Sequence, residues 1–171
     1  KSELAEILGY LKHADICKGV AEEDLLQVAQ NIEYRTVQKG NFVFHQSEVV
    51  DCCCILLTGK LTVKVENTVG AVAMIGEIDP MESFGDEWLL LRDNAAAVGD
   101  FIKPASCQSY IAERPCQLLV ILEEDFEKYL KGTCSKKLQE KGRVLSATGL
   151  FGQWSNREIF DLACVSRYKR F

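Results

Sequence analysis

Apolar residues recur every three or four positions in the first part of the chain. Residues 2–13 and 21–34 both have this spacing, which places apolar side chains on one face of a helix. Each segment is therefore predicted to be an amphipathic α-helix, and acidic residues favour the N-terminus of the second. The apolar positions are Leu4, Ile7, Leu8, Leu11, Leu25, Leu26, Val28, Ala29 and Ile32.

From residue 34 the apolar period shortens toward two, the spacing of a strand with one buried face. Glycine-containing turns are predicted at residues 39–41 and, as a tight turn, at residues 58–60. Many short strands at close spacing, with helices at both ends, predict a closed or double-layered β structure. The predicted strands are 34–37, 42–44, 52–57, 61–65 and 71–78.

The pattern becomes helical again after Asp125. Three residues between 126 and 130 share one helical face, Gly132-Thr133 is predicted to break or bend the helix, and residues 135–146 can form another. The predicted fold is therefore mostly β with flanking helices, in the α+β class.

The C-terminal segment repeats part of the beginning of the chain. Residues 145–171 align with residues 11–37, and most apolar positions correspond although few residues are identical. Ser155 and Glu158 have the spacing of a capping box, which marks a helix start in the second copy. One interpretation is coincidence, because two amphipathic helices always align to some degree. The other, which we favour, is the start of a second, similar domain.

Domain boundaries follow from this repeat. We expect a leading helix or linker at residues 1–11 and the main domain at residues 12–134. Residues 135–171 would then hold a connecting helix and the start of a truncated second domain, so that the parent protein carries tandem modules.

The composition excludes several classes of protein. The net charge of −5 gives no non-specific attraction to nucleic acid or acidic membranes. No apolar run approaches the roughly 18 residues of a membrane span. No signal-peptide core follows the first residue. We expect a cytoplasmic fragment with no nucleic acid partner and no membrane span.

The eight cysteines do not suggest a disulfide framework or a metal site. Cys52, Cys53 and Cys54 are adjacent and cannot all be bridged with normal geometry. No pair has C-x-x-C spacing, and the histidines are only His13 and His45, whereas zinc needs about four convergent ligands. The cysteines are expected to be small buried hydrophobic residues in a reducing compartment, with no metal and no cofactor.

Two blocks in the second half of the chain carry the most specific pattern. Residues 84–90 read Phe-Gly-Asp-Glu-Trp-Leu-Leu, and the second block runs from Ile111-Ala112 to Asp125-Phe126. With the strand patterns at 39–48 and 51–61, they resemble the cyclic nucleotide-binding domain family over about residues 12–145. The resemblance implies an eight-stranded β-roll or jelly roll with N-terminal helices and C-terminal hinge helices.

The first block resembles the family's phosphate-binding cassette. The resemblance implies N–H groups at a helix start and an arginine for the cyclic phosphate, and a glutamate after Phe-Gly for a ribose hydroxyl. Asp86 stands at the glutamate position, Glu87 replaces it if the register differs, and Trp88 stands where the family prefers a small residue. The candidate ligand-binding residues are Gly85, Asp86, Glu87, Trp88, Leu89, Ala105, Ser106 and Cys107.

No arginine stands at the position that the resemblance assigns to it. Counting forward from Phe84 reaches Ala95, and counting back from the second block reaches Ser106, so an insertion at about residues 94–102 is inferred. Arg92 is an alternative that would have to reach in from an unusual loop. Residues 82–105 carry five acids and two bases, a net charge of −3 that disfavours a phosphate. The cassette is therefore predicted to be degenerate, with its phosphate arginine lost. In the alternative interpretation, Asp86 and Glu87 bind no ligand and only stabilise the N-terminus of a helix.

The resemblance supports two functions and leaves little room for a third. The first is a regulatory module of a cAMP or cGMP signalling protein, such as a protein kinase or its regulatory subunit. Its ligand would be cAMP, cGMP or a related purine nucleoside, and binding of the cyclic nucleotides would be weak, altered or absent. Its partners would be neighbouring modules of the same kind or a kinase catalytic domain. The second is a ligand-free interaction or relay domain in a tandem array. An enzyme is not expected, because the two histidines form no catalytic or metal-binding motif.

Overall fold

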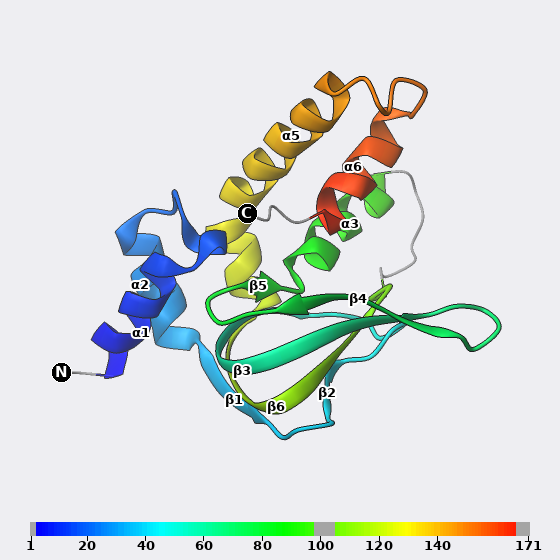
Figure 1. Cartoon of the computed structure of the whole chain (residues 1–171). Helices are drawn as coiled ribbons and strands as arrows, with labels where there is room; N and C mark the ends of the chain where they lie inside the picture. The colour runs from blue at the N-terminus through cyan, green and yellow to red at the C-terminus, as the bar shows by residue number, and fades with distance from the viewer. Residues whose placement is uncertain (1–2, 98–104, 167–171) are drawn as a thin grey trace.

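The computed structural model describes residues 3–97 and 105–166 of the chain. Helices α1 (Glu3–His13) and α2 (Glu22–Asn31) flank a 3₁₀ turn, η1 (Asp15–Cys17), and precede an antiparallel sheet. Figure 1 shows these helices at one end of the curled sheet, with the C-terminal helices over it. Both N-terminal helices and the α+β class were predicted and are confirmed.

The two longest strands, β3 (Cys52–Glu66) and β6 (Ser109–Leu122), pair side by side through the middle of the sheet. The order is β1 (Glu33–Val37), β6, β3 and β4 (Val72–Ile78), with β2 (Phe42–Phe44) paired to β6 and β5 (Ser83–Phe84) paired to β3.

The tight turn predicted at residues 58–60 is wrong. The register of β3 against β6 shifts between Leu56 and Leu61, but the strand continues through the irregularity. Gly59 has φ +101°, and a Cβ there would lie 2.6 Å from the Pro115 carbonyl oxygen. The glycine therefore marks a bulge pressed against the neighbouring strand. The strands expected at residues 52–57 and 61–65 are thus one continuous strand, and the described residues hold six strands rather than the expected eight.

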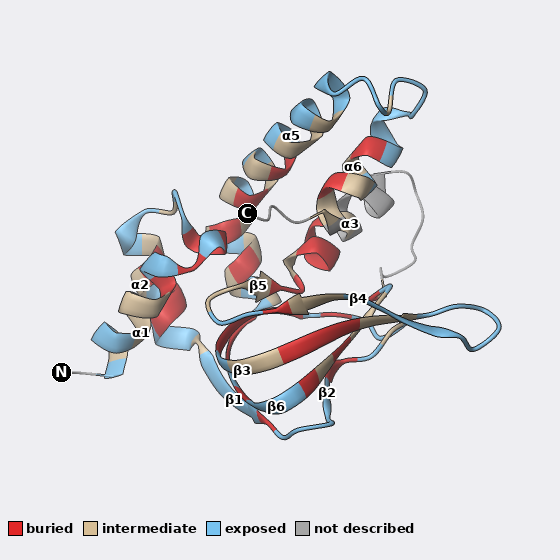
Figure 2. Cartoon of the chain, viewed as in Figure 1, coloured by how far each residue is buried: buried red, intermediate tan, exposed pale blue. Residues whose placement is uncertain are grey.

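Both faces of β3 are buried near its start, which explains the unbroken apolar run there. Cys53, Ile55 and Leu57 belong to the core between the sheet and the helices. Cys52, Cys54 and Leu56 belong to the core inside the curled sheet. Figure 2 shows red stretches on β3 that are separated by a tan stretch at the bulge.

The cysteines largely behave as predicted. All eight are free thiols, and six are buried. The expectation is wrong for Cys107, which is exposed in the segment leading into β6, and Cys164 is only half-buried. Among the described residues no group of three or more histidine, cysteine or acidic side chains could hold a metal ion.

A break or a bend was predicted at Gly132-Thr133, and the break is wrong because the helix continues through these residues. A short α4 (Glu123–Asp125) and one π-helical turn, η2 (Phe126–Leu130), lead directly into α5 (Lys131–Ala147). The irregular part of the helix is the π turn, which ends just before α5 begins. The buried side chains of Cys134 and Leu138 pack the first half of α5 against the core. Tertiary packing thus outweighs the low helix propensity of glycine.

The last described helix, α6 (Asn156–Val165), packs against α5 and against α3 (Asp86–Ala97). Its predicted capping box is confirmed: the Glu158 backbone donates to Ser155 Oγ, and the Ser155 backbone donates to Glu158. None of the helices in the described residues is long and apolar enough to cross a membrane.

Candidate functional site

Gly85 joins β5 to the N-terminus of α3, and its surroundings exclude any side chain. Its φ is +92°, and a Cβ would lie 2.9 Å from the Cys52 carbonyl oxygen and 3.1 Å from Cε2 of Phe44. The backbone of the protein's own β3 strand therefore approaches this glycine closely.

Glu87 turns back onto the start of its own helix. Oε2 of Glu87 accepts a hydrogen bond of 2.9 Å from the backbone N–H of Gly85. Its other oxygen accepts one from the hydroxyl of Tyr110 and a longer contact, 3.5 Å, from Nε2 of Gln108. Glu87 is 7% exposed, so these contacts satisfy a buried carboxylate.

Asp86 lies on the other side of this turn and lines a cavity of about 770 Å³ together with Glu87. The cavity lies between the start of α3, the η1 turn, α5 and the end of α6. Five carboxylates line it against three lysines, a net charge of −2. The carboxylates are Asp15, Glu82, Asp86, Glu87 and Glu140.

Burial and this negative charge act together on two thiols at the cavity. Burial raises the pKa of Cys134 to about 12, and the nearby Asp86 carboxylate acts in the same direction. The pKa of Cys164 is also raised to about 12, first by burial and then by nearby acids that include Asp161 and Glu87. Neither thiol is a candidate nucleophile at neutral pH, because the thiolate is the reactive form.

Trp88 and Leu89 belong to the two cores rather than to the cavity. Trp88 is 2% exposed among the side chains inside the curled sheet, and its indole Nε1 has no hydrogen-bond partner in the described part of the chain. Leu89 is fully buried between the sheet and the helices. Both positions are therefore occupied by packing.

The second group of candidates lies in the segment before β6. The backbone N–H of Ser106 donates to the Glu48 carbonyl and its carbonyl accepts from Ser47, at 2.8 and 2.6 Å. Ser106 Oγ is buried and bonds to the Gln108 carbonyl at 2.5 Å. Ala105 bridges to Val49, and Cys107 is exposed. None of these three residues lines the cavity beside Asp86 and Glu87.

Ala95 and Arg92 belong to α3, but their side chains lie outside the described residues. The predicted insertion at 94–102 also lies mostly outside them.

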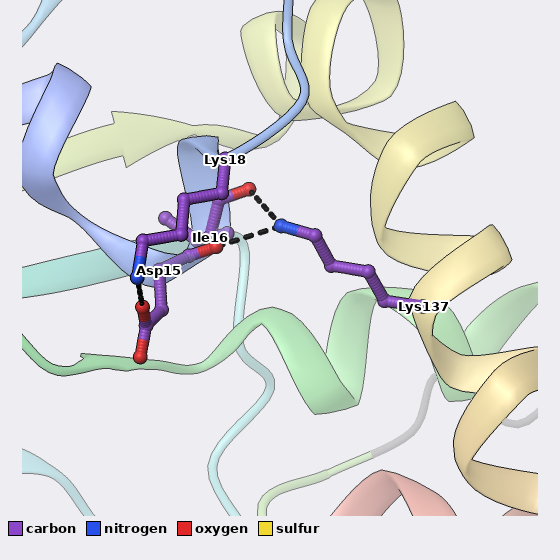
Figure 3. A network of polar contacts seen from close by, with 4 residues as sticks. All are labelled: Asp15, Ile16, Lys18 and Lys137. Carbon is purple, nitrogen blue, oxygen red and sulfur yellow. Dashed lines mark hydrogen bonds and ion pairs between the residues drawn. The ribbon is translucent and has the colours of Figure 1, made fainter.

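Two lysines of α5 bind the segments on either side of the cavity. Nζ of Lys137 donates to the Asp15 carbonyl at 2.7 Å and to the Ile16 carbonyl at 3.4 Å, while Lys18 pairs with the Asp15 carboxylate (Figure 3). Nζ of Lys141 donates to the Ser166 carbonyl at 2.9 Å. The lysines thus cap carbonyls at the ends of η1 and α6.

Sequence reasoning missed Gln108, Tyr110, Lys137 and Lys141. Gln108 immediately precedes β6 and Tyr110 is the second residue of that strand, so the two are two positions apart in extended chain. The lysines are four positions apart on one face of α5. These spacings can be read in the sequence, but each of these four side chains bonds to a residue that lies far away along the chain.

Known proteins match this chain at the level of family and fold. The family model described as "Cyclic nucleotide-binding domain" matches residues 34–133. No curated protein matches the chain significantly. Among solved structures, cAMP-bound PfPKA-R (141-441) has a TM-score of 0.72 and 16% identity, covering 96% of this chain and 55% of that one.

Two further structures are similar. The regulatory domain of Toxoplasma gondii PKA with cAMP has a TM-score of 0.70 at 15% identity, covering 96% of this chain and 59% of that chain. The regulatory subunit of a cAMP-independent protein kinase A from Trypanosoma cruzi, bound to guanosine, has a TM-score of 0.65 at 15% identity, covering 75% and 41%. The chain thus spans about half the length of these proteins, and the similarity is one of fold.

Proposed function

Because the chain belongs to the cyclic nucleotide-binding domain family, we propose that it is a regulatory module of a cAMP or cGMP signalling protein whose cassette binds cyclic nucleotides weakly or not at all. Domains of this family are typically regulatory and non-catalytic. The parent would be a protein kinase or a kinase regulatory subunit, and the partners would be neighbouring modules or a catalytic domain.

The observation that carries this proposal is the hydrogen bond from the Gly85 N–H to Glu87. A helix start binds a phosphate through backbone N–H groups that face the ligand. Here the protein's own carboxylate takes that N–H. A phosphate oxygen about 4 Å from this carboxylate would be repelled by about 4 kcal/mol at an effective dielectric constant of about 20.

The two positions that the alignment assigns to the arginine hold Ala95 and Ser106, and this supports the same conclusion. The side chain of Ser106 bonds within its own segment and carries no charge. Loss of a charge-assisted contact costs about 1.5–3 kcal/mol, roughly a ten- to hundredfold loss of affinity. The net negative lining of the cavity would also repel a cyclic phosphate that entered it.

A purine nucleoside is the second candidate ligand, and the cavity beside Asp86 favours it. A nucleoside has no phosphate to repel, and a carboxylate on the cavity wall can accept hydrogen bonds from ribose hydroxyls. The volume of about 770 Å³ is within the usual range for a small-molecule site. The Trypanosoma cruzi structure, which is bound to guanosine, supports testing this class of ligand.

A thermal unfolding titration separates these possibilities. We expect no shift with cAMP or cGMP up to millimolar concentration, whereas a nucleoside that binds should raise the melting temperature in proportion to ln(1 + [L]/Kd). Guanosine, adenosine and inosine should be titrated in parallel. Saturable stabilisation of the wild type by either cyclic nucleotide would contradict the proposal.

Ser106→Arg tests whether the missing arginine is the cause of weak or absent cyclic nucleotide binding. If it is, cAMP or cGMP should raise the melting temperature of this variant. Cys107→Arg is the matched control, because it adds the same charge at the neighbouring exposed position. Circular dichroism must first establish that both variants fold, since Ser106 is buried. If neither variant responds, the missing arginine is not the sole defect and the pocket itself is closed to cyclic nucleotides.

The alternative function, a ligand-free relay in a tandem array, is favoured by the lysine contacts of α5. Lys137 and Lys141 connect this helix to η1 and to the end of α6. Lys137→Met should then raise hydrogen exchange in residues 14–20, whereas Lys136→Met, at an exposed position, should not. Unchanged exchange in Lys137→Met would remove this candidate.

The domain division remains part of this proposal. The boundary expected between residues 134 and 135 falls inside α5, so the main module and the connecting segment share one continuous helix. The suggested start of a second module at residues 145–171 includes α6 and its capping box.

A further inference from the structure

The hairpin between β3 and β4 projects beyond the rest of the sheet and is exposed on both faces (Figures 1 and 2). In the described part of the chain β4 pairs with β3 alone, so its outer edge is open. Large apolar side chains stand on this ribbon with most of their surface in solvent. They are Val69, Val72, Met74 and Ile75, which are 84%, 60%, 56% and 55% exposed.

The tip of the ribbon lacks two of the devices that usually protect an open edge, although the register of β4 against β3 shifts between Met74 and Gly76. Edge strands commonly carry charged side chains or proline, which oppose pairing with another strand. Residues 67–76 contain neither a charged residue nor a proline. The strand at the other end of the sheet order, β1, is protected in the usual way by Glu33 and Arg35.

We propose that β4 pairs in antiparallel fashion with β4 of a second copy of this chain, so that two sheets join into one. The net charge of −5 makes two copies repel each other over most of their surfaces. The uncharged tip of the ribbon, residues 67–76, is a surface on which they can meet without that repulsion. This inference does not depend on which ligand, if any, the cassette binds.

Two-fold symmetry restricts the register of such a pair. Residues that face each other across a two-fold axis perpendicular to the sheet must lie on the same face. An axis at Ala73 satisfies this condition and sets Val72 of one copy opposite Met74 of the other. Apolar cross-strand pairs of this kind stabilise a sheet, whereas like charges directly opposite each other destabilise it.

Sedimentation velocity over a range of concentrations tests the proposal. The wild type should pass from the monomer mass of 19.2 kDa toward twice that value as concentration rises. The double variant V72K/M74K places lysines opposite lysines and should stay monomeric. The variant V72K/M74E places lysine opposite glutamate and should recover dimerisation relative to V72K/M74K.

Tyr34→Lys is the matched control, because Tyr34 is 55% exposed on the other edge strand and its replacement should leave the dimer unchanged. Circular dichroism and melting temperature establish that each variant is folded. A wild type that remains monomeric at millimolar concentration would overturn the proposal. So would a folded V72K/M74K variant that dimerises as well as the wild type, or equal masses for the two charge variants.

Discussion

The hydroxyl group of Tyr110 donates a hydrogen bond to the carboxylate of Glu87, joining the start of β6 to the first turn of α3. Tyr110 is fully buried, and its ring stacks on Phe84 with the centroids 4.8 Å apart. Since Glu87 also bonds to the Gly85 backbone, this side chain connects the first sequence block that resembled the family to the residue just before the second. The acid at the cassette therefore has a structural role whether or not a ligand binds.

Tyr110→Phe should destabilise the fold by about 1–3 kcal/mol, because a buried carboxylate loses a donor while the ring packing is kept. Urea denaturation gives the free energy of unfolding. Tyr10→Phe is the control: Tyr10 donates to Glu6 at 3.2 Å on the exposed surface of α1, and its loss should cost less than about 0.5 kcal/mol. Equal effects of the two variants would contradict the role given to Glu87.

Gly85→Ala should destabilise the protein by at least about 2 kcal/mol. The left-handed backbone disfavours a Cβ by about 1–2 kcal/mol, and the Cβ would also press on the Cys52 carbonyl oxygen. Gly9→Ala in the middle of α1 meets no atom within 4 Å and should instead stabilise by about 0.5–1 kcal/mol. A neutral Gly85→Ala would mean that the loop before α3 relaxes freely.

Ser47→Gly should stabilise the protein. Ser47 adopts the left-handed conformation that favours glycine, with φ +70°. Glycine removes a strain of about 1–2 kcal/mol but loses more entropy on folding, so a net gain of about 0.5–1 kcal/mol is expected by thermal or urea unfolding. Ser135→Gly, within α5, should instead cost about 0.5 kcal/mol. Loss of stability at position 47 would show that its hydroxyl outweighs the strain.

Local patterns predicted the elements well, whereas features set by distant contacts were missed. The helices α1 and α2 and the capping box of α6 depend on neighbouring residues, so their spacing was enough. The path of β3 through Gly59 depends on its pairing with β6, more than 50 residues away. A glycine in a bulge and a glycine in a turn are the same signal in a sequence.

In the candidate site, too, features set by neighbouring residues were predicted and features set by distant contacts were missed. The sequence located the start of α3 and its two acids, but it could not assign different roles to Asp86 and Glu87. Those roles depend on Tyr110 and on the path of β3 past Gly85. Likewise, the apolar pattern could not distinguish a pocket wall from a core position at Trp88.

Alkylation by iodoacetamide at pH 8 should reach Cys107 first. It is the exposed cysteine among the eight, although partial burial raises its pKa somewhat. Cys17 and Cys134 are buried, and burial raises the pKa of both to about 12, so the native protein holds almost no reactive thiolate there. Peptide mapping by mass spectrometry gives the order of modification. Modification of Cys17 or Cys134 in the native state before Cys107 would contradict the described burial.

The same thiols should make stability fall at high pH. A cysteine thiol in the unfolded chain has its ordinary pKa of 9.0, whereas the pKa is about 12 in the folded state, so the folded state retains protons that the unfolded state releases. The contribution is therefore complete below about pH 9 and is lost progressively as the pH rises toward 12. Each thiol should lower the free energy of unfolding by about 1 kcal/mol per pH unit near pH 10.

Urea titrations between pH 7 and 10.5 under reducing conditions measure this slope. Cys17→Ala and Cys134→Ala should each make this slope less steep, because the slope depends only on the difference in bound protons between the unfolded and folded states. The space left by the removed thiol lowers stability at every pH and does not change the slope. Cys107→Ala is the control and should change the slope least, since Cys107 is the least buried of these thiols. Parallel slopes for the wild type and both buried-cysteine variants would show that these thiols titrate alike in the folded and unfolded chain.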